Sequence, residues 1–188
     1  MLEDGMTQQT FNGTFSCDIE TDGIDASKVW CIAVHNVYDE GTRMWYPEEG
    51  WDINENGSFQ DWLDSDEVYT LVFHNGIAFD IPVLEKLYGI DFSNVEIQDT
   101  MLLSQLDNPR RDGGHSLANW GEYLGYPKGD HEDWSKLSTE MINYCLRDVE
   151  ITTKVYKLMR QKGLSEDAIQ LEYATKKHCT LQEKNGWL

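Results

Sequence analysis

The first third of the chain carries its apolar residues in short segments that resemble β-strands. Phe15, Cys17 and Ile19 alternate with polar residues, and β-branched and aromatic residues are frequent throughout. Turns containing Gly or Asp separate the segments. Strands that follow one another through short turns favour an antiparallel meander. The predicted strands comprise residues 11–20, 29–38 and 42–46.

The middle of the chain alternates short apolar runs with the longer period of helices. An apolar run at 69–73 precedes a helical pattern that tolerates Pro82 in its first turn. A second run at 95–98 precedes another helix, and Asp99 is placed to cap it. Strand followed by helix indicates crossover connections between parallel strands. The helices predicted in this region comprise residues 59–63, 81–88 and 100–106.

The last part of the chain has helical patterns after a stretch of loop composition at 107–114. One predicted helix, 115–124, is closed by Gly125. A long helix begins at its cap Ser138 and ends near Gly163, and a final helix covers about 165–184. The sequence thus predicts an α/β fold: a mixed sheet, with antiparallel strands first and parallel strands later, flanked by helices.

Length and composition fit a single domain of 188 residues. The longest apolar run, residues 29–34, is far too short to cross a bilayer, so we expect no membrane partner. The first ten residues lack the basic start and apolar stretch of a secretory signal, which predicts a cytoplasmic setting. The four cysteines lack the spacing of a zinc site and are expected to be reduced, mostly buried thiols.

The formal net charge of −19 argues against strong, extended binding to nucleic acid. Such binding usually depends on Lys and Arg side chains that neutralise phosphates and release counterions. Any nuclease hypothesis must therefore place the attraction in bound metal ions, in a few local basic residues, or in a separate basic partner.

Asp18 and Glu20 are two residues apart in the first predicted strand, so both carboxylates project from one face. They repel each other unless a cation lies between them. The alternative is an ordinary solvated strand face, because two acids at this spacing are common.

Asp80 ends the segment FHNGIAFD, in which a buried strand turns through Asn75 and Gly76 into a helix. A side chain in this position can reach the end of the sheet. The alternative role is a helix cap, because capping residues often precede a proline in the first turn.

Asp148 falls inside the apolar stripe of the long predicted helix, where an unpaired charge costs several kcal/mol. Tyr144 lies one turn earlier on the same helix face. The alternative is a buried hydrogen bond between these two side chains. The stripe consists of Met141, Cys145, Thr152, Val155 and Met159.

If the fold brings these acids together, they supply hard oxygen ligands that suit magnesium or manganese rather than zinc. Two such ions can stabilise the attacking and leaving oxygens of an in-line displacement at phosphorus, which is hydrolysis of a phosphodiester. Tyr144 is then placed to orient the attacking water. The four acids are Asp18, Glu20, Asp80 and Asp148.

The chain resembles the DEDD superfamily of 3′-to-5′ exonucleases in three motifs that occur in the expected order. They are DIETDGI at 18–24, HNGIAFD at 74–80 and YCLRD at 144–148. The tyrosine four residues before the last aspartate is similar to the tyrosine subclass, because the histidine subclass needs its histidine at position 143, which is Asn143 here. The implied fold is ribonuclease H-like.

The resemblance implies a role for each motif residue. Asp18, Glu20 and Asp148 hold one Mg²⁺ ion, for which Mn²⁺ can substitute. A second ion is bridged by Asp18 and held through water by Asp80, and Tyr144 positions the nucleophile. The residues implied to bind the terminal nucleotide are Thr21, Ile24 and Asn75. Ile24 is expected to wedge against a base, with a place in the buried core as the alternative.

The similarity is greatest to the proofreading exonuclease domain of phage-type family A DNA polymerases. HSLANWGEYLG at 115–125 and QEKNGWL at 182–188 look like segments of those proteins. By this resemblance, residues 1–163 form the exonuclease domain, and residues 164–188 form a helix similar to the lead-in to a polymerase region. The implied partners are the 3′ end of single-stranded DNA and a polymerase region or subunit, in the host cytoplasm if the chain is phage-encoded.

A proofreading domain holds only a few nucleotides, and its polymerase supplies most of the duplex contact. The negative net charge is therefore compatible with this function. Arg110, Arg111 and Lys128 are candidates for phosphate contacts, although residues of this kind are often merely solvated. Two alternatives stay open: an RNA-processing exonuclease similar to ribonuclease D, and a catalytically silent module that binds a polymerase or DNA ends. Silent relatives usually lose an acidic ligand, and all four acids are present here.

Overall fold

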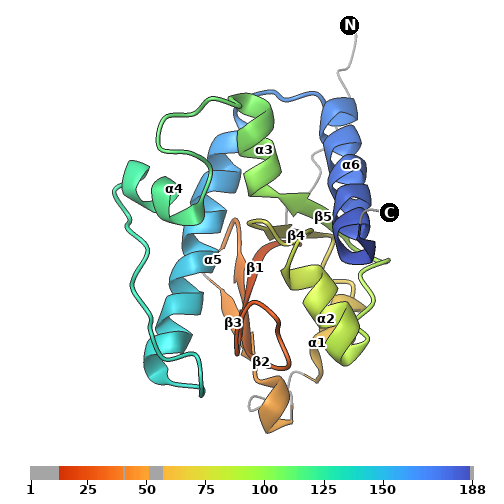
Figure 1. The fold of residues 1–188 in the computed structure, drawn as a ribbon, viewed down its shortest axis with the longest axis vertical. Coiled ribbons are helices and arrows are strands. Elements are labelled where there is room, and N and C mark those ends of the chain that lie inside the picture. The colour runs from red at the N-terminus through yellow and green to blue at the C-terminus, as the bar shows by residue number, and fades with distance from the viewer. Residues whose placement is uncertain (1–12, 40, 51–56, 187–188) are drawn as a thin grey trace, which may run out of the picture.

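The computed structural model describes residues 13–39, 41–50 and 57–186. Its sheet has the strand order β3-β2-β1-β4-β5, and helices flank the sheet (Figure 1). The first three strands pair antiparallel, and β4 and β5 join parallel to β1. The predicted meander, crossovers and mixed α/β sheet are therefore confirmed. The strands are β1 (Thr14–Thr21), β2 (Val29–Asn36), β3 (Thr42–Trp45), β4 (Thr70–Phe73) and β5 (Glu96–Asp99).

Most boundaries agree with the sequence pattern, and the exceptions have local causes. Residues 11 and 12 of the first predicted strand lie outside the described residues. The second strand was predicted too long: β2 ends at Asn36, whose side-chain oxygen accepts hydrogen bonds from the backbone N–H groups of Tyr38 and Asp39 and so turns the chain.

The predicted helices are all present, with small shifts at their ends. The fourth helix begins at Leu117 rather than at residue 115, because Ser116 caps it. Asp99 and Ser138 cap the third and fifth helices as predicted. The helices are η1 (Pro47–Glu49, a short 3-10 helix), α1 (Phe59–Leu63), α2 (Asp80–Tyr88), α3 (Thr100–Asp107), α4 (Leu117–Tyr123), α5 (Thr139–Arg160) and α6 (Glu166–Asn185).

The alternation of β1 separates an apolar face from a polar face. Phe15, Cys17 and Ile19 belong to a core that includes aromatic residues such as Trp62, whose ring centre lies 5.0 Å from that of Phe15. Ser16, on the other face, bonds to the long helix α5: its Oγ donates to the backbone oxygen of Val149 at 2.9 Å. The long helix α5 packs against β1 (Figure 1). The even-numbered residues of β1, which include Asp18 and Glu20, therefore face α5.

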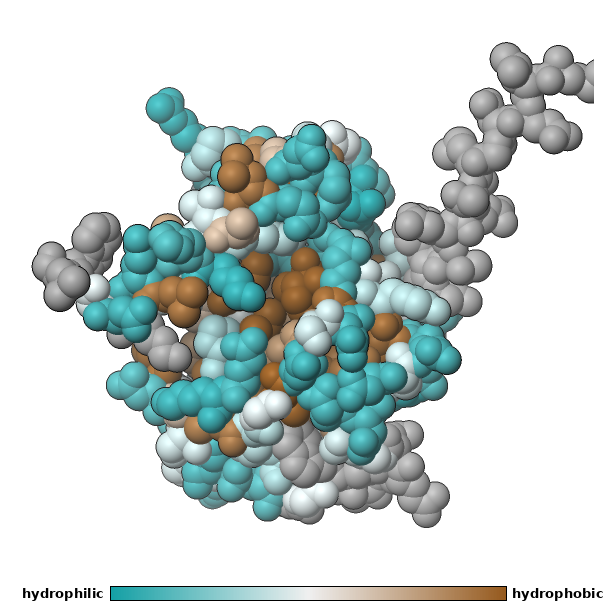
Figure 2. Space-filling model, turned by 90° about the vertical axis from the view of Figure 1, so that its right-hand side faces the viewer, coloured by the Kyte–Doolittle hydropathy of each residue, from teal (hydrophilic) through white to brown (hydrophobic). Residues whose placement is uncertain are grey.

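Figure 2 shows one side of the molecule, on which hydrophilic residues predominate and apolar side chains gather in a hollow near the centre. Within the described part of the chain, no helix is both long enough and apolar enough to cross a membrane.

Candidate active site

Asp18 and Glu20 lie near the carboxyl end of the central strand β1. A carboxylate oxygen of each lies within 4.8 Å of the other and of the Cys145 sulfur on α5. The pairing with β2 becomes irregular between Glu20 and Thr21, and the strand ends at Thr21. The prediction that both carboxylates share one face is confirmed.

Asp80 is the first residue of α2 and is 6% exposed. The N-cap position belongs to Phe79, whose side chain makes no capping hydrogen bond. The alternative that Asp80 is a helix cap is therefore wrong. The backbone N–H of Ile19, in β1, hydrogen-bonds to the Asp80 carboxylate. This bond ties the start of α2 to the strand that carries Asp18 and Glu20.

The turn that leads into Asp80 is held by Asp99, at the end of β5. The carboxylate of Asp99 accepts hydrogen bonds from the backbone N–H of Asn75 at 3.0 Å and of Ile77 at 3.3 Å. Asn75 has a φ of 68°, a left-handed conformation that is uncommon outside glycine. A side chain on Gly76 would collide with Phe73, because its Cβ would lie 2.3 Å from the Phe73 Cβ. The sequence predicted Asp99 only as the cap of α3. It did not predict that Asp99 also accepts hydrogen bonds from this turn.

Asp148 is 2% exposed on the face of α5 that meets the sheet. Its Oδ2 forms an ion pair with the ammonium of Lys128, while its Oδ1 is buried and has no hydrogen-bond partner among the described residues. The alternative of a buried hydrogen bond between Tyr144 and Asp148 is therefore wrong, because Lys128 takes the place of that partner. Lys128 also lies over the Tyr144 ring, with Nζ 4.5 Å from the ring centre.

An aromatic group packs around Tyr144. The ring centre of Trp134 lies 5.7 Å from that of Tyr144, and the ring of His131 lies 4.6 Å from that of Trp134. The Trp30 indole N–H, on β2, donates to the backbone oxygen of Trp134 at 3.0 Å and anchors the segment. The sequence pattern did not single out these residues, because they lie in a stretch without periodicity.

We refer to Asp18, Glu20, Asp80 and Asp148 as the carboxylate cluster. Each of its members has a raised pKa, caused first by burial. For Asp18, repulsion from the other three carboxylates adds to this effect. The pKa values are raised to about 9 for Glu20, about 7 for Asp80 and about 6 for Asp148. The environment of the cluster therefore disfavours the ionised form of its carboxyl groups.

The cluster fits divalent cations that prefer oxygen ligands. Its acids repel one another, and the Oδ1 atom of Asp148 is buried without a partner among the described residues. Carboxylate oxygens are the ligands of Mg²⁺ and Mn²⁺. The Cys145 thiol is not counted as a ligand. Burial raises its pKa, and its sulfur lies 3.6 Å from the backbone oxygen of Asp18 as a weak hydrogen-bond donor.

The residues expected to bind substrate lie in the segments that follow Glu20 and precede Asp80. Ile24 is 90% exposed, just beyond the end of β1, so the alternative of a buried core residue is wrong. The Thr21 hydroxyl donates to the backbone oxygen of Gly23 at 2.9 Å and shapes the same loop. Asn75 lies in the turn that precedes Asp80.

The two arginines proposed for phosphate contacts lie elsewhere. Arg111 stacks over Trp120, with its guanidinium carbon 3.7 Å from the ring centre, and donates to the backbone oxygen of Gly114. Arg110 is exposed in the same loop. Of the three basic candidates, Lys128 is the one that the structure brings to the carboxylate cluster.

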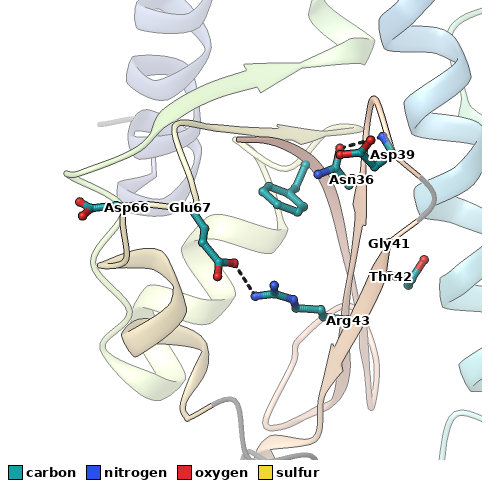
Figure 3. A pocket seen from close by; sticks show the side chains of 8 residues that line it. Asn36, Asp39, Gly41, Thr42, Arg43, Asp66 and Glu67 are labelled. Atoms are coloured by element: carbon teal, nitrogen blue, oxygen red, sulfur yellow. Dashed lines mark hydrogen bonds and ion pairs between the residues drawn. The ribbon is translucent and has the colours of Figure 1, made fainter. Parts of the chain in front are cut away.

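A hollow of about 510 Å³ lies at a different place, between the β2–β3 hairpin and the segment before β4. Its one cationic lining residue, Arg43, is ion-paired with Glu67 at 2.8 Å (Figure 3). Asp39 and Asp66 also line it. None of the predicted site residues is among those that line it, and its acidic lining does not suit a phosphate.

Comparison with known proteins places these features in a family. Residues 6–163 match the family model described as 3′-5′ exonuclease of the DNA polymerase A type. The DNA-directed DNA polymerase of Enterobacteria phage T3 is 26% identical over 198 residues, an alignment that covers 79% of this chain and 26% of that protein. The polymerase of Escherichia phage T7 is also 26% identical, with coverage of 69% and 24%. The chain thus spans about a quarter of the length of these relatives.

Solved structures show the same fold at low sequence identity. The structure of Brucella melitensis NrnC with bound Mg²⁺ is 19% identical, with a TM-score of 0.67, and the match covers 92% of this chain and 84% of that chain. The expected ribonuclease H-like fold is confirmed by this likeness.

Proposed function

Because this chain belongs to the 3′-5′ exonuclease family that residues 6–163 match, we propose that it removes nucleotides from the 3′ end of single-stranded or frayed DNA. The observation that carries the proposal is the carboxylate cluster, in which buried acids from β1, α2 and α5 raise one another's pKa beside a tyrosine. Such a group is costly to fold unless it serves to hold cations.

The proposed cofactor is Mg²⁺, bound as two ions, with Mn²⁺ as a substitute. Asp18, Glu20 and Asp148 are the proposed ligands of one ion, and Asp18 and Asp80 those of the other. When bound, such ions lower the pKa of a water ligand and stabilise the charge that develops at phosphorus. The same charge compensates the negative cluster and attracts the phosphates of a substrate to an acidic protein.

Tyr144 is the proposed positioning residue for the attacking water. Burial raises the pKa of its phenol, so the hydroxyl stays protonated at neutral pH and can both donate and accept a hydrogen bond. The surrounding rings of Trp134 and His131 restrict the orientation of Tyr144. A fixed hydroxyl reduces the orientational freedom of the water before reaction.

The proposed place of the terminal nucleotide is the loop that follows Glu20. Ile24 presents an apolar side chain to solvent, which suits a wedge against the face of a base. Thr21 and Asn75 are the proposed polar contacts. Lys128 remains a candidate for a phosphate contact.

The proposed setting is proofreading for a DNA polymerase, with α6 as the helix that leads towards a polymerase region. The identity to the T3 and T7 polymerases supports this setting. A polymerase, as a region of the same protein or a separate subunit, would supply the duplex contacts that a net charge of −19 disfavours. For a phage-encoded protein, the place of action is the cytoplasm of the host.

Substrate class is tested with 5′-labelled single-stranded DNA and RNA of one sequence, incubated separately with the protein and Mg²⁺. Faster shortening of the DNA is expected. Faster shortening of the RNA would favour the alternative similar to ribonuclease D, since the 2′-hydroxyl distinguishes the two substrates. Absence of hydrolysis of either, from a protein that circular dichroism shows to be folded, would favour the silent module.

A further inference from the structure

Lys128 places a cation among carboxylates to which the proposed function assigns metal ions. Its ammonium is ion-paired with Asp148, and the two side chains are 22% and 3% exposed. The same ammonium lies over the ring of Tyr144. Lys128 therefore contacts both Tyr144 and Asp148, the first and last residues of the third motif.

The backbone around Lys128 is held against two helices, so the point from which its flexible side chain extends is fixed. The backbone N–H of Tyr126 donates to the oxygen of Gly121, on α4, at 2.8 Å. The Arg147 side chain, on α5, donates to the backbone oxygen of Pro127 at 3.0 Å. A Cβ on Gly121 would lie 3.0 Å from the backbone nitrogen of Lys128, so the close approach of the two backbone segments needs glycine.

The ion pair compensates only part of the negative charge of the cluster. The Lys128 ammonium carries one positive charge, and it is ion-paired with one of the four acids of the cluster. Its contact satisfies one oxygen of Asp148 and leaves the other without a partner among the described residues.

We propose that Lys128 is a displaceable counter-ion: it holds Asp148 when no divalent ion is bound and gives up that carboxylate when one binds. The inference rests on the proposed metal-binding function of the cluster. A metal ion and an ammonium compete for the same carboxylate, and two cations repel each other strongly in a poorly solvated site. Lys128 therefore raises the concentration of metal needed to fill the site.

The test is the affinity for Mn²⁺ alone, measured by titration calorimetry on the whole chain without nucleic acid. Lys128→Met is expected to bind Mn²⁺ at least about tenfold more tightly than wild type, which corresponds to about 1.4 kcal/mol. Lys154→Met is the matched control. It removes the same charge from α5, where Lys154 is exposed and lies 4.8 Å from the centre of the Tyr126 ring. The affinity of this control is expected to stay within about twofold of wild type, because charges at the surface are screened.

Two further variants separate the possible failures. Lys128→Arg keeps the charge and is expected to bind Mn²⁺ no more tightly than wild type. This variant keeps the inference testable if Lys128→Met folds poorly. Equal or weaker binding by a folded Lys128→Met, with saturable binding by wild type that Asp148→Asn abolishes, overturns this inference alone. Absence of saturable Mn²⁺ binding by wild type overturns the proposed metal site, and the inference with it.

Discussion

At the scale of single residues, the site is a set of acids in positions that disfavour their own ionisation. Glu20 is 5% exposed and its pKa is raised to about 9, first by burial and then by repulsion from Asp148. The hydrophobic core could have contained apolar side chains here at lower cost. The retention of these acids makes sense if each has a cation to bind.

Asp18 has three neighbours of like charge, Glu20, Asp80 and Asp148, and its replacement tests the cluster. Asp18→Ala is expected to lower the rate of nucleotide release by at least about 10² to 10³, the loss seen when one electrostatic stabiliser is removed elsewhere. The measurement is the initial rate on a labelled single-stranded DNA. Asp167→Ala, an exposed acid on α6, is the control for loss of one negative charge. A rate near that of wild type would remove Asp18 from the site.

Tyr144 is expected to matter less than any carboxylate, because it positions water without holding metal. Tyr144→Phe keeps the ring against Trp134 and Lys128 and removes only the hydroxyl. The expected loss of rate is smaller than that of Asp18→Ala in the same assay. A larger loss would contradict this ranking and give the phenol a direct part in the chemistry.

At the scale of elements, the site depends on how strand ends and helix starts are fixed. Asp99 accepts hydrogen bonds from the turn before α2 and also from the backbone N–H of Met101 at 3.0 Å in α3. One carboxylate thus joins β5, the turn that carries Asn75, and the start of α3. The position of Asp80 follows from this arrangement.

Asp99→Ala is expected to lower the free energy of unfolding by about 2 kcal/mol or more, because buried N–H groups lose their acceptor. Chemical denaturation followed by circular dichroism measures the change. Asp91→Ala is the matched control, since exposed Asp91 accepts a bond from the backbone N–H of Ser93, and its effect should stay within about 0.5 kcal/mol. Equal effects of the two substitutions would show that Asp99 does not hold the turn.

The elements were largely predictable because their ends carry local signals. Ser138 and Asp99 are caps that the sequence displays, and Asp148 was noticeable because it interrupts an apolar stripe. Lys128 was not predictable as a partner of Asp148. It lies in a segment without periodicity, and its position depends on contacts with Gly121 and Arg147 that only the tertiary fold creates.

At the scale of the whole molecule, buried acids couple the stability of the fold to pH. Folded-state pKa values of about 6, about 7 and about 9 for Asp148, Asp80 and Glu20 lie above the value of about 4 for carboxylates in an unfolded chain. Between these limits the folded state binds more protons than the unfolded state. The stability that protonation provides is complete below about pH 4 and is lost as pH rises towards about 9.

The melting temperature of the protein in EDTA is therefore expected to fall between about pH 5 and about pH 9. Added Mg²⁺ should raise it more at the alkaline end, because the ligands must be deprotonated to bind metal. Differential scanning calorimetry measures both effects. Glu20→Gln should flatten the decrease. A melting temperature in EDTA that rises over this range would contradict the assigned direction of the pKa shifts.

The negative net charge of the molecule also bears on how the chain binds its substrate. With 34 acidic and 15 basic residues, the proposed function needs its attraction to nucleic acid from metal ions in the cluster and from local contacts. This charge is compatible with a domain that binds only the end of a nucleic-acid strand while a partner binds the duplex.

The most direct test of the central claim is a time course of digestion of a 5′-labelled single-stranded DNA oligonucleotide in Mg²⁺, in Mn²⁺ and in EDTA. Asp18→Ala is the control. The account predicts a ladder of products that shortens from the 3′ end in either metal and is abolished by EDTA and by the substitution. Immediate release of the labelled 5′ nucleotide, or a ladder that persists in EDTA, would contradict a metal-dependent exonuclease acting from the 3′ end.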